Sequence, residues 1–185
     1  MRYFISDTHF FHRNIIRLNP LKRKVGFESL IIENLRKALK EEDELYLVGD
    51  FLWTLEPEFL ELWKSVPGRK ILIKGNHDLW FPEEELKPFF DEIVPFYTIL
   101  EVRGKKVLLS HYPARDLRTF RYRELQKEIS EIYHRESCSL LLHGHVHWNR
   151  FGVFCGCHLE SVKCINVNVE FTNYWPISEE ELPLW

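Results

Sequence analysis

Five short motifs carry the residue types that bind metal ions or move protons. They are DTH at 7–9, GD at 49–50, GNHD at 75–78, SH at 110–111 and GHVH at 144–147. Imidazole, carboxylate and carboxamide groups are common ligands of divalent ions, and histidine also transfers protons near neutral pH. GNHD combines all of them with a glycine, which allows a tight turn or a close approach of the backbone.

The spacing inside two of these motifs is that of ligands on an extended chain. Asp7 and His9 are two residues apart, and so are His145 and His147. Alternate residues of an extended segment point to the same side, so each pair can face one pocket. Helical metal sites of the HExxH type instead need ligands one turn apart.

Predicted strands explain how these motifs come together. Each motif ends an apolar or β-prone run, and the runs are 2–6, 45–48, 69–73, 107–110 and 140–142. Open α/β sheets bind ligands outside the carboxyl ends of their strands. We therefore expect one site built from five strand ends, which deliver Asp7, His9, Asp50, Asn76, His77, His111, His145 and His147.

Helical patterns alternate with these strands and predict an α/β fold. Apolar spacing indicates an amphipathic helix over 27–39, and further helices are expected at 57–66, after Pro82 and around 124–134. Segments 97–102 and 107–110 form a predicted hairpin, and 153–155 with 164–169 form a predicted closing pair of strands. Ser178 and Glu181 make a capping box for a last short helix.

Length and composition favour one compact domain over residues 1–185. The chain is 45% hydrophobic with a formal net charge of −3, which gives no reason to expect a protein coated in nucleic acid. No apolar run is long enough for a membrane-spanning helix, and the amino terminus begins directly with a predicted strand. We expect a cytoplasmic protein with reduced cysteines and no membrane partner.

The ordered set of five motifs closely resembles the calcineurin-like metallophosphoesterases, and the resemblance extends from the first strand to residue 147. The family includes phosphatases, phosphodiesterases and Mre11-type nucleases. The resemblance implies a four-layer α/β sandwich of two mixed β-sheets flanked by helices. It also implies a dinuclear metal centre that hydrolyses a phosphate ester by attack of a metal-bridging hydroxide.

Carried over to this sequence, the resemblance implies a role for each motif residue. Asp7, His9 and His147 would hold one metal ion. Asn76, His111 and His145 would hold a second, and Asp50 would bridge the two. Manganese is the favoured ion, while iron, nickel, cobalt and zinc also suit such ligands.

Two histidines outside the ligand set receive other roles from the same resemblance. His77 would donate a proton to the leaving group or stabilise the phosphoryl oxygens. His12 would contact the substrate. Asp78 either orients His77 or caps the following turn. His143 has no motif role and is interpreted as structural.

The residues after Asp50 favour phosphodiester over phosphomonoester hydrolysis. Phe51, Leu52 and Trp53 stand where the protein-phosphatase branch carries an aspartate and a phosphate-binding arginine. The expected substrate is a small phosphate ester or a nucleotide, and the oligomeric state stays open. A non-catalytic scaffold is a further alternative, although no ligand of the set is missing.

Two other segments allow alternative functions. The basic and aromatic segment 115–123 could meet a nucleic acid, as in an Mre11-like nuclease, although a solvated loop is the favoured interpretation. Cys155, Cys157, His158 and Cys164 could form a zinc site. Their spacing lacks paired CxxC motifs, which favours free thiols in a packed hairpin.

Overall fold

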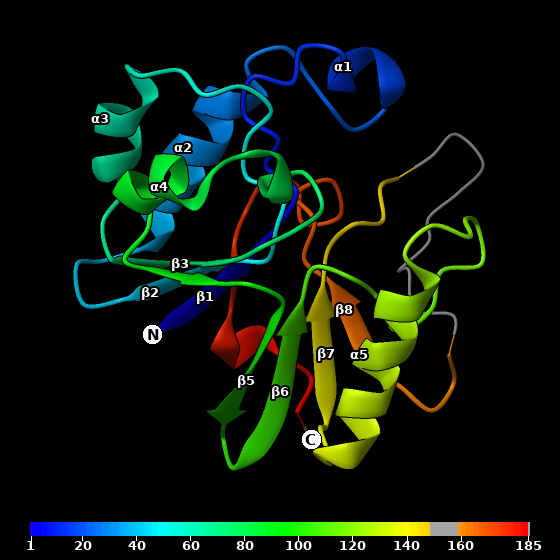
Figure 1. Ribbon diagram of the computed structural model, residues 1–185. Helices are drawn as coiled ribbons and strands as arrows, with labels where there is room; N and C mark the ends of the chain where they lie inside the picture. The colour runs from blue at the N-terminus through cyan, green and yellow to red at the C-terminus, as the bar shows by residue number, and fades with distance from the viewer. Residues whose placement is uncertain (149–158, 185) are drawn as a thin grey trace.

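Two β-sheets face each other in the computed structural model, which describes residues 1–148 and 159–184 (Figure 1). In spatial order, the first sheet contains β4 (Glu92–Val94), β3 (Arg69–Ile73), β2 (Glu44–Leu47), β1 (Arg2–Ile5) and β9 (Ile177–Ser178). The second contains β5 (Tyr97–Val102), β6 (Lys105–Ser110), β7 (Leu140–His143) and β8 (Cys164–Asn166).

Both sheets are mixed. Strands β1 to β4 run parallel to their neighbours, whereas β9 is antiparallel to β1. In the second sheet, β5 and β6 form the predicted antiparallel hairpin, and β6, β7 and β8 are parallel. Parallel neighbours end at the same edge, so the loops after β1, β2, β3, β6 and β7 can meet.

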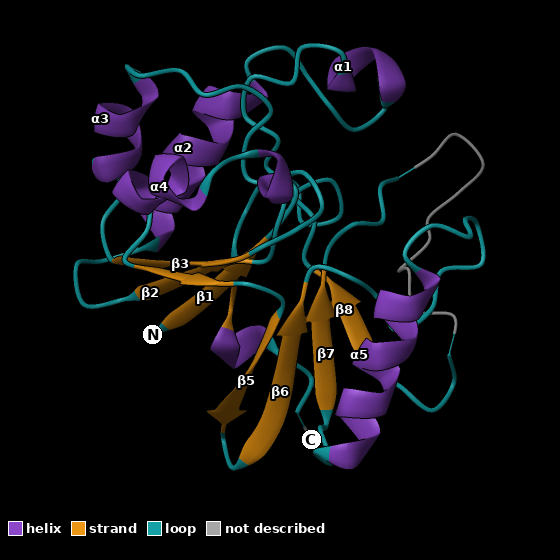
Figure 2. Cartoon of the chain, in the orientation of Figure 1, coloured by secondary structure: helices purple, strands orange, loops and turns teal. Residues whose placement is uncertain are grey.

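Helices cover the outer face of each sheet (Figure 2). Three of them, α2 (Phe27–Ala38), α3 (Phe59–Lys64) and α4 (Glu83–Leu86), lie over the first sheet, and α5 (Arg123–Arg135) lies over the second. The short α1 (Ile15–Leu18) stands apart, beyond the strand ends. Among the described residues, the 3-10 helices are η1 (Asp78–Trp80), η2 (Lys87–Phe89) and η3 (Glu179–Glu181).

Alternating side chains of the strands build three apolar layers. In β3, Ile71 and Ile73 pack between the two sheets, whereas Leu72 packs toward the helices of the first sheet. In β7, Leu140 joins the layer between the sheets and Leu141 packs toward α5. Successive side chains of a strand point to opposite faces, so each strand serves two cores. The predicted four-layer sandwich of two mixed sheets is confirmed.

Several predicted elements differ from the structure in extent. The closing strand expected over 164–169 is limited to β8, which pairs with β7, and its expected partner 153–155 lies outside the described residues. The short elements α1, β4 and β9 were not predicted, because two to four residues carry little periodic signal. The capping box of Ser178 and Glu181 is present at η3.

Within the described parts of the chain, we find no helix with the length and apolar character needed to cross a membrane.

Candidate metal centre

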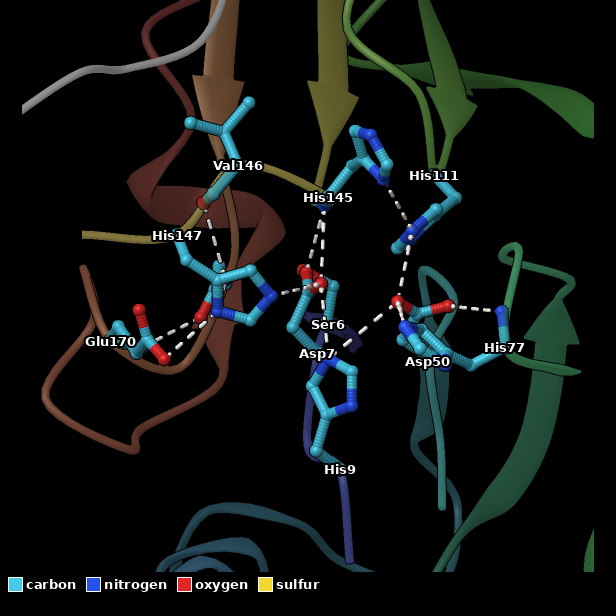
Figure 3. Close-up of polar contacts among 12 residues, drawn as sticks. Ser6, Asp7, His9, Asp50, His77, His111, His145, Val146, His147 and Glu170 are labelled. Atoms are coloured by element: carbon cyan, nitrogen blue, oxygen red, sulfur yellow. Dashed lines mark hydrogen bonds and ion pairs between the residues drawn. The ribbon is translucent and has the colours of Figure 1, made fainter. Parts of the chain in front are cut away.

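The carboxyl ends of β1, β2, β3, β6 and β7 deliver their polar residues to one place between the sheets. Figure 3 shows the carboxylates of Asp7 and Asp50 at its centre, with imidazole rings around them. All eight residues expected from the five strand ends lie in this cluster, including Asn76, which touches both His111 and His145.

The first group of potential ligands surrounds Asp7. The Oδ1 atom of Asp7 lies 3.7 Å from Nε2 of His9 and 3.4 Å from Nε2 of His147. Ligand atoms of these three residues all lie within 4.8 Å of one another. The three residues expected to hold one ion therefore converge on a single point.

Asn76, His111 and His145 form a second group. Oδ1 of Asn76 lies 3.1 Å from Nε2 of His111 and 3.0 Å from Nδ1 of His145. The two imidazole nitrogens are 3.3 Å apart. Ligands about 2.1 Å from a common ion lie about 3.0 Å apart in octahedral and about 3.4 Å apart in tetrahedral coordination, so this spacing suits one ion.

Asp50 lies between the two groups. Its Oδ2 atom is 3.5 Å from Nε2 of His9 and 3.3 Å from Nε2 of His111. Its Oδ1 atom accepts a hydrogen bond from the backbone N–H of His77 at 3.0 Å. The backbone of His77 thus fixes the Asp50 carboxylate through Oδ1, and Oδ2 faces both ligand groups.

The chemistry of this donor set fits divalent cations. Neither ring nitrogen of the buried His9 has a hydrogen-bond partner among the described residues, and such orphan groups are rare in folded proteins. Burial lowers the pKa of His9 to about 4 and that of His145 to about 3, so both rings are neutral at pH 7 and able to bind metal. Although both rings are buried, the charge of Asp50 raises the pKa of His111 to about 10 and the charge of Glu170 raises the pKa of His147 to about 9, so a bound cation would take the place of the protons on these two rings.

Glycines allow this close packing of ligands. A Cβ atom at Gly75 would lie 2.3 Å from Oδ1 of Asp50, and one at Gly144 would lie 2.3 Å from Oδ2 of Asp7. Both distances are far inside van der Waals contact. Gly75 of GNHD and Gly144 of GHVH therefore leave the space that the carboxylates of Asp50 and Asp7 occupy.

The ligand loops are also strained. Asp7, His9, Asp50 and His145 adopt positive φ angles of 54°, 47°, 56° and 65°. Non-glycine residues rarely adopt this conformation, which costs of order 1 kcal/mol or more each. Such strain persists where the surrounding structure over-determines the backbone, as it does at functional sites.

Asp78 links two of the ligand loops. Its carboxylate accepts hydrogen bonds from the backbone N–H groups of Gly75, Asp50 and Phe51, at 2.7, 2.8 and 2.9 Å. Burial and the nearby Asp50 charge raise the pKa of Asp78 to about 7. Among the described residues, these hydrogen bonds go to neither the His77 ring nor the following turn, so Asp78 fastens the loop after β3 to the loop after β2.

Glu170 contacts a member of the first group and was not among the residues predicted from the motifs. Its Oε1 atom lies 2.9 Å from Nδ1 of His147 and accepts a hydrogen bond from Nε of Arg23 at 2.7 Å. Both charged side chains are fully buried. A carboxylate on one ring nitrogen orients a histidine so that the other nitrogen can bind metal. Asn166 ends β8, and Asn168 and Glu170 follow it at a spacing of two residues, which was the available signal in the sequence.

Two other residues singled out in the sequence lie outside the ligand groups. His12 stacks on Trp53, with ring centroids 3.8 Å apart, and lines a pocket beside His9. His143 is buried in β7, and its Nδ1 lies 2.8 Å from the carbonyl oxygen of Gly144.

Segment 115–123 reaches the site only in part. Arg121 and Tyr122 line a pocket of about 220 Å³ with Asp50 and Asn76. Arg118 pairs with Asp116 at 2.8 Å and donates to the backbone carbonyl of His147. Of the proposed zinc ligands, Cys164 lies in β8, and the other three residues lie outside the described residues.

Comparison with known proteins places the chain in a family. The family model of the calcineurin-like phosphoesterase superfamily domain matches residues 2–162 of the chain. The chain belongs to this superfamily, whose members are metal-dependent phosphoesterases.

The chain is also similar to individual proteins. The chain is 56% identical to a protein of unknown function from Aquifex aeolicus whose crystal structure is known, with a TM-score of 0.91 over 98% of this chain and 96% of that one. It is 28% identical to an uncharacterized protein from Methanocaldococcus jannaschii, over 95% of this chain and 85% of the relative. The phosphopantetheinyl hydrolase of Mycobacterium tuberculosis shares the fold, with 12% identity, a TM-score of 0.54 and coverage of 100% of this chain and 97% of that one.

Replacing Glu170 with glutamine should weaken metal binding. The substitution keeps the side-chain shape but removes the charge that orients His147 and balances Arg23, and loss of such a partner typically costs about 10–100-fold in metal affinity. Titration calorimetry with Mn²⁺ measures the effect.

Glu180→Gln is the matched control, because Glu180 is exposed at the end of the chain. Unchanged Mn²⁺ affinity in a folded Glu170→Gln protein would show that Glu170 does not support the ligand His147.

Proposed function

We propose that this chain is a dinuclear metal-dependent phosphoesterase that prefers phosphodiesters. Membership of the calcineurin-like superfamily supports phosphoesterase activity. The observation that carries the finer proposal is the position of Asp50, whose Oδ2 atom faces both ligand groups at 3.5 and 3.3 Å. A carboxylate shared in this way suits two adjacent cations.

The roles of the residues follow from their places. Asp7, His9 and His147 would hold one ion and Asn76, His111 and His145 the other, with Asp50 between them. Two bound dications would polarise the phosphoryl oxygens and supply a nucleophile by lowering the pKa of water. Asp78 and Glu170 would keep the ligand loops in position.

His77 is the residue proposed to meet the leaving group. Its backbone N–H holds Asp50, while its Nε2 lies 3.8 Å from Oδ2 of Asp50 and its side chain remains 20% exposed. The ring is therefore beside the ligands and still open to a substrate. Burial lowers the pKa of His77, and the Asp50 charge opposes this shift.

The loop after β2 supports the diester preference. Phe51 and Leu52 are fully buried, and Trp53 is aromatic, so these three residues offer no positive charge to a phosphate. A monoester dianion carries one more charge than a diester and needs more cationic groups. The small Arg121 pocket supports a nuclease as the second candidate, because its guanidinium could meet another phosphate.

We further propose that residues 1–185 form one domain that acts in the cytoplasm on a small phosphate ester or nucleotide. Manganese is the favoured ion, since mixed imidazole and carboxylate ligands suit it.

Hydrolysis of bis(p-nitrophenyl) phosphate and p-nitrophenyl phosphate tests the proposal. With added Mn²⁺ we expect the diester to be the better substrate by kcat/KM, and chelation should abolish turnover because the metals supply the nucleophile. Labelled oligonucleotides in the same panel test the nuclease alternative. Absence of metal-stimulated turnover on every substrate would contradict the proposal.

His77→Ala tests the proton donor. A leaving group with a low pKa needs no proton, so we expect a small loss for p-nitrophenyl esters and a loss of about 10²-fold or more for alkyl esters. The readout is kcat for a series of diesters that differ only in the pKa of the leaving alcohol. An equal loss across the series would exclude proton donation by His77.

A further inference from the structure

A cavity of about 400 Å³ opens beside the first ligand group, next to α1. Figure 1 shows α1 beyond the carboxyl ends of the strands, on the side where the ligand loops lie. Six of the nine described residues that line the cavity carry aromatic rings: His9, His12, Trp53, His77, His147 and Trp148. Ile15 and Leu18 of α1 add aliphatic surface.

The lining offers no charge beyond the imidazoles. Among its described residues there is no aspartate, glutamate, lysine or arginine. The remaining polar residue, Asn19, donates from Nδ2 to the carbonyl of Trp148 and to Oε2 of Glu170, each at 2.7 Å. A charged group would lose its hydration here without compensation, whereas an uncharged ring would gain apolar contact.

The aromatic rings that line the cavity pack against one another, and the packing extends to His77 at the metal centre. His12 and Trp53 are nearly parallel, at an interplanar angle of 6° and a centroid distance of 3.8 Å. The ring of Trp80 is T-shaped to those of Trp53 and His77, with ring centroids 5.2 and 4.4 Å apart. Rings held in this way lose little freedom when a ligand ring joins them.

A second pocket beside the metal centre differs in character. This pocket of about 220 Å³ shares His77 and His147 with the cavity and is also lined by Thr119, Arg121 and Tyr122. It therefore adds a guanidinium and two hydroxyl groups, which the described lining of the cavity lacks. A phosphodiester with two unlike groups would bind in one orientation.

We propose that the cavity between α1 and Trp53 binds an uncharged aromatic ring carried on one ester group of the substrate, either a nucleobase or an aryl group. Trp53, His12 and Leu18 are then specificity-determining residues. This inference rests on the proposed function, because the ring must be tethered to a phosphoryl group at the metal centre. Cavities of this size are typical of small-molecule sites.

Binding of phosphonates to the Mn²⁺-loaded protein tests the inference without turnover. Calorimetry would compare methylphosphonate, n-octylphosphonate, 1-naphthylphosphonate and the 5′-methylenephosphonate analogue of AMP. We expect 1-naphthylphosphonate or the AMP analogue to bind at least tenfold tighter than methylphosphonate. Tighter binding of the naphthyl probe indicates an aryl group, and tighter binding of the AMP analogue indicates a nucleobase. Equal affinities, or tightest binding of the octyl probe, would overturn the inference.

Substitutions in the cavity test which residues produce the preference for a ring-bearing probe. Trp53→Ala and Leu18→Ser should each reduce the ring preference, to below threefold for Trp53→Ala. Leu62→Ser on α3 is the matched control and should leave the preference unchanged, because Leu62 is an exposed leucine outside the cavity. Leu18 is 75% exposed, so its variant keeps the test open if Trp53→Ala does not fold.

The two proposals fail in different ways. If methylphosphonate binds but rings add nothing, or if both variants keep the full preference, only the aromatic site is overturned. If no phosphonate binds and no ester is hydrolysed, the proposed function fails together with the aromatic site.

Discussion

The structure depends on two carboxylates that are buried side by side. Asp7 and Asp50 follow the neighbouring parallel strands β1 and β2, and Nε2 of His9 lies within 3.7 Å of an oxygen of each. Burying two carboxylates away from water costs free energy unless cations lie between or beside them. The surroundings fit that requirement, since imidazoles and a carboxamide oxygen lie around the two carboxylates as further potential ligands.

The surrounding residues keep this arrangement in place. Asp78 joins the loops after β2 and β3 through backbone N–H groups, and Glu170 ties His147 to the buried Arg23. Arg23 also donates to the backbone carbonyl of Thr8, so the tail of the chain supports the first ligand loop. These contacts offset the strained backbone at Asp7 and Asp50 and leave the ligands preorganised.

Much of the fold and of the site was predictable from local patterns. Short apolar runs that end in aspartate or histidine indicated both the strands and the edge where they meet, and the two-residue spacing at Asp7 and His9 indicated extended ligand loops. The structure brings together each residue that this reasoning selected. Their roles as metal ligands stay a prediction.

Other features depended on contacts that sequence spacing does not encode. Glu170 contacts His147 directly and pairs with Arg23, which lies 147 residues away, and its own segment has a weak strand pattern. Phe51 and Trp53 are both hydrophobic and lie two residues apart, yet Phe51 is buried in the core and Trp53 lines the cavity. Strand β9 is two residues long and is defined by pairing with β1, not by its composition.

Metal stoichiometry tests the central claim most directly. The purified chain would be dialysed against excess Mn²⁺ and analysed by inductively coupled plasma mass spectrometry, with Asp50→Asn beside it. The shared position of Asp50 predicts two ions per chain in the native protein and fewer than two in the variant. One ion or none in the native protein, or two in both proteins, would contradict a dinuclear centre bridged by Asp50.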